Sequence, residues 1–134
     1  MNKKIIIFDL DDTLVNHRMK IPRQTYHMLN KFKKAGYLIG VISYNILVNL
    51  VAKETNLYKY TTHVYYGNLD RDKLFKKCVL NIIEDITSTI EYEIYYVDDR
   101  KDNLECVKQN FTNVNTYHCK NMYELYKFKH TIKN

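Results

Sequence analysis

Three acidic residues within four positions are the first place in this sequence where chemistry could occur. Asp9, Asp11 and Asp12 directly follow the apolar residues 5–8. Carboxylates this close repel one another unless a cation lies between them, and Mg²⁺ prefers carboxylate and carbonyl oxygen. If the chain stays extended, Asp9 and Asp11 point the same way, so that one could attack a phosphorus while the other protonates the leaving group. An acidic turn that caps the next segment is the alternative.

Two further polar clusters follow strand-like runs. Ser43 ends the second run, where its hydroxyl and the next backbone amides could cradle a phosphate or simply cap a helix. Asp98 and Asp99 follow residues 93–97, and two adjacent acids again suggest a cation. Asn103, one helical turn further on, could orient the cation's ligands. A helix-capping turn is the alternative for this cluster.

Lysines between these clusters could supply positive charge. Lys73 lies in the first turn of a predicted helix, the end that projects toward the carboxyl ends of the strands. There an ammonium could neutralise a nucleophile and a phosphate as negative charge gathers. Lys76 lies about one turn deeper in the helix and so farther from the carboxyl ends of the strands. A solvated helix face is the ordinary explanation for both lysines.

Short apolar runs alternate with helical patterns along the chain. Strands are predicted at residues 4–8, 37–42, 63–66, 93–97 and 114–117. Helices are predicted from Pro22 to Gly36, over the apolar positions 46, 47, 50 and 51, from Asp70 to Ile86, from Asp102 or Asn103 to 111, and over 122–126. This alternation predicts an α/β fold, a single Rossmann-like three-layer sandwich whose mostly parallel sheet carries helices on both faces. In such sheets ligands bind beyond the carboxyl ends of the strands, where the polar clusters fall.

Size and composition favour one intracellular domain, residues 1–134. Apolar residues make up 46% of the chain and charged residues 27%, with no bilayer-spanning run and no signal-peptide pattern. We therefore expect a cytoplasmic protein without a membrane association. The abundance of Lys, Asn, Ile and Tyr indicates an AT-rich genome, microbial or viral. The net charge of +6 suits an anionic substrate or a nucleic-acid end, although solubility explains it as well.

The cysteines indicate no disulfide and no zinc site. Cys78, Cys106 and Cys119 are an odd number and form no C-x-x-C pair. Cys78 and Cys106 fall on helical faces, which favours small buried hydrophobes kept reduced.

The polar clusters, in their order along the chain, resemble the four motifs of haloacid dehalogenase (HAD) phosphatases. Asp9-Leu10-Asp11-Asp12-Thr13-Leu14 is similar to motif one, with Asp12 where many members carry glycine. Ser43 matches motif two, and Asp98-Asp99-x-x-x-Asn103 matches motif four. Lys73 would be motif three, although the spacing of Lys76 to Asp98 fits that motif about as well. The resemblance spans residues 4 to about 107.

The resemblance implies a role for each matched residue. Asp9 would be the nucleophile that forms an aspartyl-phosphate, and Asp11 would protonate the leaving group and then activate water. Ser43 and Lys73 would hold the phosphoryl group. Magnesium would be bound by Asp9, the backbone carbonyl of Asp11 and Asp99, with Asp98 behind them. The implied activity is magnesium-dependent hydrolysis of a phosphate monoester.

Short spacings between the motifs leave no room for the cap domain that many HAD enzymes carry. A capless site must take a bulky substrate or be closed by an oligomeric neighbour. The magnesium-dependent phosphatase-1 group is most similar in length and in its fourth motif. We expect a phosphorylated protein or a small phosphate ester as substrate. A nucleic-acid 3'-end phosphatase is the alternative, followed by a non-catalytic phosphate-binding interaction module.

Overall fold

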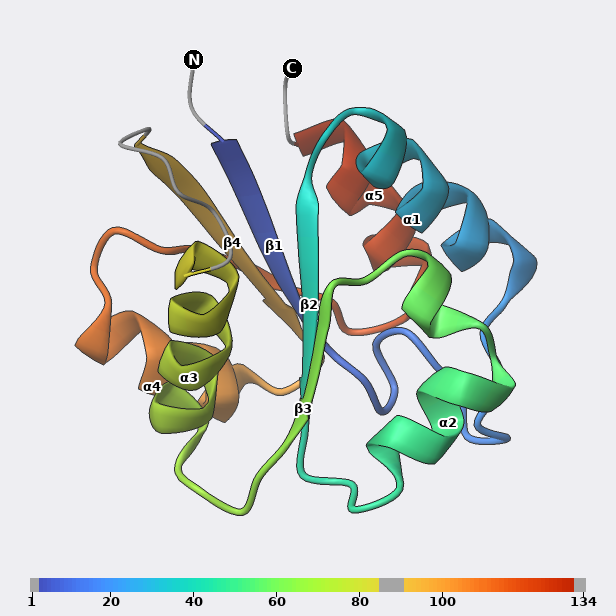
Figure 1. Ribbon diagram of the computed structural model, residues 1–134, viewed down its shortest axis with the longest axis horizontal. Coiled ribbons are helices and arrows are strands. Elements are labelled where there is room, and N and C mark those ends of the chain that lie inside the picture. The colour runs from blue at the N-terminus through green and yellow to red at the C-terminus, as the bar shows by residue number, and fades with distance from the viewer. Residues whose placement is uncertain (1–2, 85–90, 132–134) are drawn as a thin grey trace.

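The fold is a three-layer α/β sandwich built on one parallel sheet (Figure 1). The computed structural model describes residues 3–84 and 91–131. Within these residues the sheet has five strands in the order β3-β2-β1-β4-β5, and every neighbouring pair is parallel. The strands are β1 (Lys3–Asp9), β2 (Leu38–Ser43), β3 (His63–Tyr66), β4 (Tyr92–Asp98) and β5 (Asn115–His118). The predicted fold class is confirmed.

Helices cover both faces of the sheet. One face carries α1 (Arg23–Lys34), α2 (Val48–Glu54) and α5 (Met122–Thr131), and the other carries α3 (Arg71–Glu84) and α4 (Lys101–Asn110). A 3₁₀ turn, η1 (Leu57–Lys59), follows α2. The predicted continuation of the third helix to Ile86 lies outside the described residues. Among the described residues, none of the helices has the length and apolar character needed to cross a membrane.

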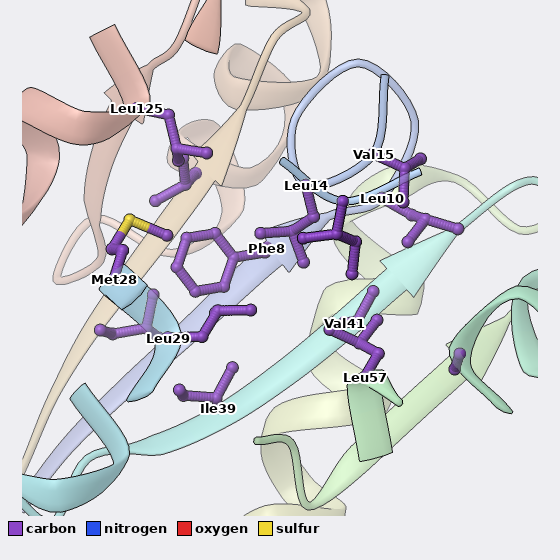
Figure 2. Packing of buried hydrophobic residues seen from close by; sticks show 14 of the residues in the cluster. Phe8, Leu10, Leu14, Val15, Met28, Leu29, Ile39, Val41, Leu57 and Leu125 are labelled. Atoms are coloured by element: carbon purple, nitrogen blue, oxygen red, sulfur yellow. The ribbon is translucent and has the colours of Figure 1, made fainter. Parts of the chain in front are cut away.

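The central strand β1 is buried on both faces, which explains its unbroken apolar run. Ile6 and Phe8 belong to the core under α1, α2 and α5, whereas Ile5 and Ile7 belong to the core under α3 and α4. All four side chains are fully buried. Figure 2 shows the first core, in which the ring of Phe8 lies among side chains from the helices and the neighbouring strand, including those of Met28, Leu29, Leu125 and Ile39. Because β1 lies at the centre of the sheet, its C-terminal residue Asp9 is surrounded by protein.

Close packing of α3 on β2 requires a glycine at position 40. A Cβ atom there would lie 2.7 Å from Sγ of Cys78 and 2.9 Å from Cδ1 of Ile7, closer than side chains pack. The missing side chain leaves room for Cys78 and Ile82 of α3 to pack against the sheet. Cys78 is thus a buried hydrophobe, as predicted, and all three cysteines are free thiols.

Two predicted helix features are wrong in detail. The second helix is predicted over the apolar positions 46, 47, 50 and 51, yet Ile46, Leu47 and Leu50 are 71%, 54% and 50% exposed. The reason is that Oδ1 of Asn45 accepts a hydrogen bond from the backbone N–H of Leu47, at 2.9 Å, and forms a turn ahead of α2. The helix therefore begins only at Val48 and buries Val48, Val51 and Ala52 instead. Likewise α4 begins at Lys101, ahead of the predicted start at Asp102 or Asn103.

Candidate active site

Three carboxylates meet at the carboxyl ends of β1 and β4. The two strands are neighbours in register, with Phe8 beside Val97, so Asp9 and Asp98 end adjacent strands. Asp9 is 5% exposed, Asp98 is fully buried and Asp99 is half-buried. One oxygen from each of the three carboxylates can lie within 4.8 Å of the others. The structure therefore brings together the two acidic clusters that the sequence placed about ninety residues apart.

Burial and mutual repulsion set the protonation of these acids. Burial raises the pKa of Asp9 well above its ordinary value, the neighbouring charge of Asp98 raises it further, and the guanidinium of Arg71 opposes both effects. Burial likewise raises the pKa of Asp99. Carboxylates with this arrangement bind a proton readily, and their oxygens also suit a hard cation.

Asp98 is held rigidly by three donors. The hydroxyl of Tyr96 and Nδ2 of Asn103 both donate to Oδ2 of Asp98, the second at 3.0 Å, and the backbone N–H of Arg100 donates to Oδ1 at 2.9 Å. Burial, together with the charge of Asp98, raises the pKa of Tyr96 well above its ordinary value, so its hydroxyl stays a donor. Asn103 thus orients an acid of the cluster, as predicted. These bonds occupy Asp98 and leave Asp9 and Asp99 better placed to offer lone pairs to a cation.

Asp11 lies in a turn after β1 rather than in the strand. Extended structure ends at Asp9, so the expected alternation of side chains does not reach Asp11. Backbone hydrogen bonds from Leu14 and Val15 to the carbonyl of Leu10 close the turn. Asp12 has a φ of 61°, a left-handed conformation that favours glycine.

Ser43 and Asn45 meet Asp11 from the end of β2. Oγ of Ser43 donates to one carboxylate oxygen of Asp11 and Nδ2 of Asn45 donates to the other, both at 3.4 Å. The backbone N–H of Asn45 in turn donates to Oγ of Ser43 at 2.9 Å, which fixes the hydroxyl. Asp11 is therefore positioned by the loop after β2. Its side chain is not one of the three clustered carboxylates, and its predicted metal contact, through the backbone carbonyl, stays a prediction.

Arg71, the first residue of α3, is the site residue that the sequence prediction missed. Its side chain is 4% exposed; Nη2 donates to Oδ1 of Asp9 at 3.1 Å, and Nε lies 3.8 Å from Oδ2 of Asp98. The ring of Tyr44 covers the guanidinium, whose central carbon lies 4.2 Å from the ring centroid. Nε and Nη1 are buried and have no hydrogen-bond partner among the described residues. Unpartnered buried donors are costly, so these two are suited to an anion that enters the site.

Lys73 is not brought to the carboxylates. Its side chain is 65% exposed and its ammonium lies 3.9 Å from Asp70, on the surface of α3. Lys76 is exposed as well. The cation facing Asp9 in the described residues is Arg71, two positions before the predicted lysine. Arg71 could have been found from helical spacing, because it lies on the same stripe as the apolar positions 74, 75 and 78.

The three carboxylates, whose charge Arg71 balances only in part, fit a divalent cation. The donor set is all oxygen, and three acids face one buried positive charge, which leaves an excess of negative charge at the cluster. A cation would relieve that excess, and the free guanidinium donors would still be available to an anion. The arrangement can therefore hold a cation and an oxyanion side by side.

Solved structures with a similar fold include a HAD-superfamily hydrolase. The crystal structure of a HAD-superfamily hydrolase from Ehrlichia chaffeensis is similar over 87% of this chain, with a TM-score of 0.62 and 12% sequence identity. This chain spans 64% of that hydrolase's length. At this identity the likeness shows a shared fold, so the sandwich is a HAD-like α/β fold.

Other comparisons add little. A hypothetical protein from Geobacillus kaustophilus HTA426 matches 63% of this chain and 38% of its own, with 17% identity and a TM-score of 0.39, too low to support a conclusion. No protein-family model matches the sequence. None of the curated proteins matches it significantly.

Proposed function

We propose that the protein is a magnesium-dependent phosphatase of the HAD type that hydrolyses a phosphate monoester through an aspartyl-phosphate. The observation that carries this proposal is the carboxylate of Asp9, buried beside Asp98 and Asp99 and bonded to a guanidinium whose Nε and Nη1 make no hydrogen bond within the described residues. A nucleophile, an oxygen-lined cation site and a phosphate-binding donor thus adjoin at one sheet edge, the usual ligand edge of such folds. The HAD-like fold supports the same class of chemistry.

Each residue of the site has a defined task in this proposal. A carboxylate oxygen of Asp9 attacks phosphorus, and Nε and Nη1 of Arg71 donate to the phosphoryl oxygens. Asp11, oriented by Ser43 and Asn45, protonates the departing oxygen and afterwards takes a proton from the attacking water. Ser43 also remains a candidate phosphate ligand, as does Lys73 if its side chain swings inward.

Magnesium would be held by Asp9 and Asp99, with Asp98 behind them and the carbonyl of Asp11 as a further ligand. When bound, it neutralises the charge of the carboxylates and of the phosphoryl group. Within the described residues no extra domain covers this edge of the sheet, which supports a capless enzyme similar to the magnesium-dependent phosphatase-1 group. A phosphorylated protein or a small phosphate ester remains the proposed substrate.

Release of phosphate from p-nitrophenyl phosphate tests the chemistry. Activity should require Mg²⁺, disappear with EDTA and disappear in Asp9→Asn. Asp12→Asn is the matched control, because it removes an exposed carboxylate of the same turn and should keep activity. If Asp9→Asn retains wild-type activity, or if both variants lose it equally, the acids do not have the proposed roles.

Phosphate release from several phosphorylated compounds tests which class of substrate the enzyme prefers. Phosphotyrosine and phosphoserine peptides would be compared with a 3'-phosphorylated oligonucleotide at several salt concentrations. A salt-dependent preference for the oligonucleotide would favour the nucleic-acid-end alternative. Titration calorimetry that detects neither Mg²⁺ nor a phosphate analogue would exclude both the enzyme and the phosphate-binding module.

A further inference from the structure

Positive charge is concentrated in one part of the chain. Residues 13–53 contain seven lysines and arginines and not one acidic residue, which more than accounts for the net charge of +6. Most of this charge lies on α1 and on the segment leading to it, on the outer side of the molecule (Figure 1). The excess charge is therefore a local feature, and the site around Asp9 does not use it.

One hollow beside α1 combines cations with tyrosine rings. Its volume is about 230 Å³, and its lining is Arg23, Tyr26, His27, Asn30, Lys59 and Tyr60. The rings of Tyr26 and Tyr60 lie 5.8 Å apart between centroids, at an angle of 49°. Nζ of Lys59 lies 5.8 Å from the centroid of Tyr60. The lining therefore combines positive charge with two tyrosine rings that are half-buried against the core, and it contains no carboxylate of the described residues.

A second hollow lies on the other side of His27. Its volume is about 350 Å³, and it is lined by Gln24, His27, Lys31 and Tyr126. Arg23, His27 and Lys31 are four residues apart and so form one exposed ridge of α1 between the two hollows. This second lining again holds a cation, an amide and a tyrosine without an acid. The two hollows and their shared ridge are called the α1 surface below.

The geometry points to the α1 surface as a binding site for single-stranded nucleic acid. Sequence-independent binding of single strands combines a cationic groove for phosphates with aromatic rings for bases, and both are present here. A membrane surface would instead need exposed apolar side chains on the helix. The apolar residues Met28, Leu29 and Phe32 of α1 are buried in the core, and none of the exposed large apolar residues of the described chain lies on α1.

Fluorescence anisotropy with a labelled single-stranded oligonucleotide of about 12 nucleotides tests this assignment. The full chain is used with EDTA, and the oligonucleotide carries a 3'-hydroxyl, so that the phosphatase site has nothing to hydrolyse. The result is thus independent of the proposed activity. Arg23→Ala/Lys59→Ala removes two charges of the α1 surface. Lys3→Ala/Lys77→Ala is the matched control, because it removes two exposed charges elsewhere.

Counterion release gives the expected size of the effect. Each phosphate contact to a single strand contributes a slope of about 0.7 in a plot of log affinity against log salt. Removing two contacts should make the slope about 1.4 less steep and weaken binding about 25-fold near 0.1 M salt. The control pair should change neither the salt slope nor the affinity by more than about 2-fold. An equal loss in both pairs overturns the assignment, as does the absence of binding at low salt.

Substitution of the tyrosines distinguishes binding of nucleic acid, which stacks its bases on the rings, from binding of any other polyanion. Tyr60→Leu keeps apolar bulk but removes the stacking face, and should weaken binding at least about 5-fold. Tyr58→Leu, in the neighbouring exposed position, should bind as the wild type does. If heparin or duplex DNA binds as tightly as the single strand, or if vesicles with anionic lipids bind instead, the surface is not a single-strand site.

Discussion

Replacement of Arg71 by methionine tests the electrostatic basis of the site most directly. Arg71→Met keeps an unbranched side chain but removes the guanidinium that lies 3.1 Å from Asp9 and 3.8 Å from Asp98. Removing one partner of a buried ion pair costs about 3–5 kcal/mol, since the remaining charge is left without compensation. Arg71 is 4% exposed and therefore little screened by water. We expect a loss of that size in the metal-free protein at neutral pH.

Urea unfolding in EDTA measures this loss. Lys73→Met is the control, because within the described residues its exposed ammonium pairs with Asp70 alone, at 3.9 Å and with both side chains largely in water. That variant should change stability by at most about 0.5 kcal/mol. Arg71→Lys should fall between the two, because it restores the charge without the planar fork. Saturating Mg²⁺ should recover part of the loss in Arg71→Met, since the cation supplies positive charge to the same carboxylates.

Activity of the same variants separates Arg71 from Lys73. If Arg71 holds the phosphoryl group, Arg71→Met should lower kcat/KM by at least about 10²-fold, whereas Lys73→Met should keep most of the activity. Wild-type stability in Arg71→Met would refute the charge coupling described above. A larger loss of activity in Lys73→Met than in Arg71→Met would restore the lysine to the role that the sequence predicts.

Three further outcomes follow from individual residues. Asp12→Gly should stabilise the protein by up to about 1 kcal/mol in urea unfolding, because Asp12 has a φ of 61°, a left-handed conformation that glycine adopts more easily. An unchanged free energy of unfolding would argue against strain at this position. The folded-state pKa of Asp9 is raised, so native protein holds its proton longer, and metal-free stability should fall as pH rises from about 4 through that pKa. The stability of Asp9→Asn, measured by unfolding at each pH, should lack this fall. If the stabilities of wild type and Asp9→Asn change in parallel with pH, the raised pKa of Asp9 is contradicted. Burial raises the pKa of Cys78 and of Cys119 to about 12, so a thiol reagent should label Cys106 alone in the native protein and all three cysteines in denaturant.

The fold was predictable because the pattern that identifies β1 depends only on burial. A run that is apolar at every position requires a strand covered on both faces, and Ile6 and Ile7 indeed enter opposite cores. The start of α2 was not predictable in the same way. Apolar residues at 46, 47 and 50 match helical spacing, but the side chain of Asn45 holds a turn first and changes which positions face the core.

The acids were predictable from their positions, since parallel neighbouring strands bring their carboxyl ends together. Asp9 and Asp98 therefore meet as the strand order requires. The side chain of Asp11 was harder to place, because the extended structure stops at Asp9 and the following turn sends Asp11 toward Ser43. Alternation along a strand says nothing about residues beyond its last hydrogen bond.

Arg71 was missed because the sequence reasoning compared lysines by their distance from Asp98 rather than by their helical face. Positions 71, 74, 75 and 78 recur at helical spacing, and Leu74, Phe75 and Cys78 are core residues. Lys73 and Lys76 lie on the opposite, exposed side. An arginine on a buried apolar stripe is costly unless charges compensate it.

The burial of Arg71 also bears on the two explanations of the first acidic cluster and favours a cation site. An acidic turn that merely caps a segment would direct its carboxylates to backbone N–H groups. In the described part of the chain, Asp9 instead accepts from the side chains of Arg71 and Thr13, and it lies within reach of two further acids. A buried acid bonded in this way contributes little to local chain geometry. The arrangement is suited to a cation and an anion rather than to a helix cap, and it supports the phosphoryl transfer proposed for this protein.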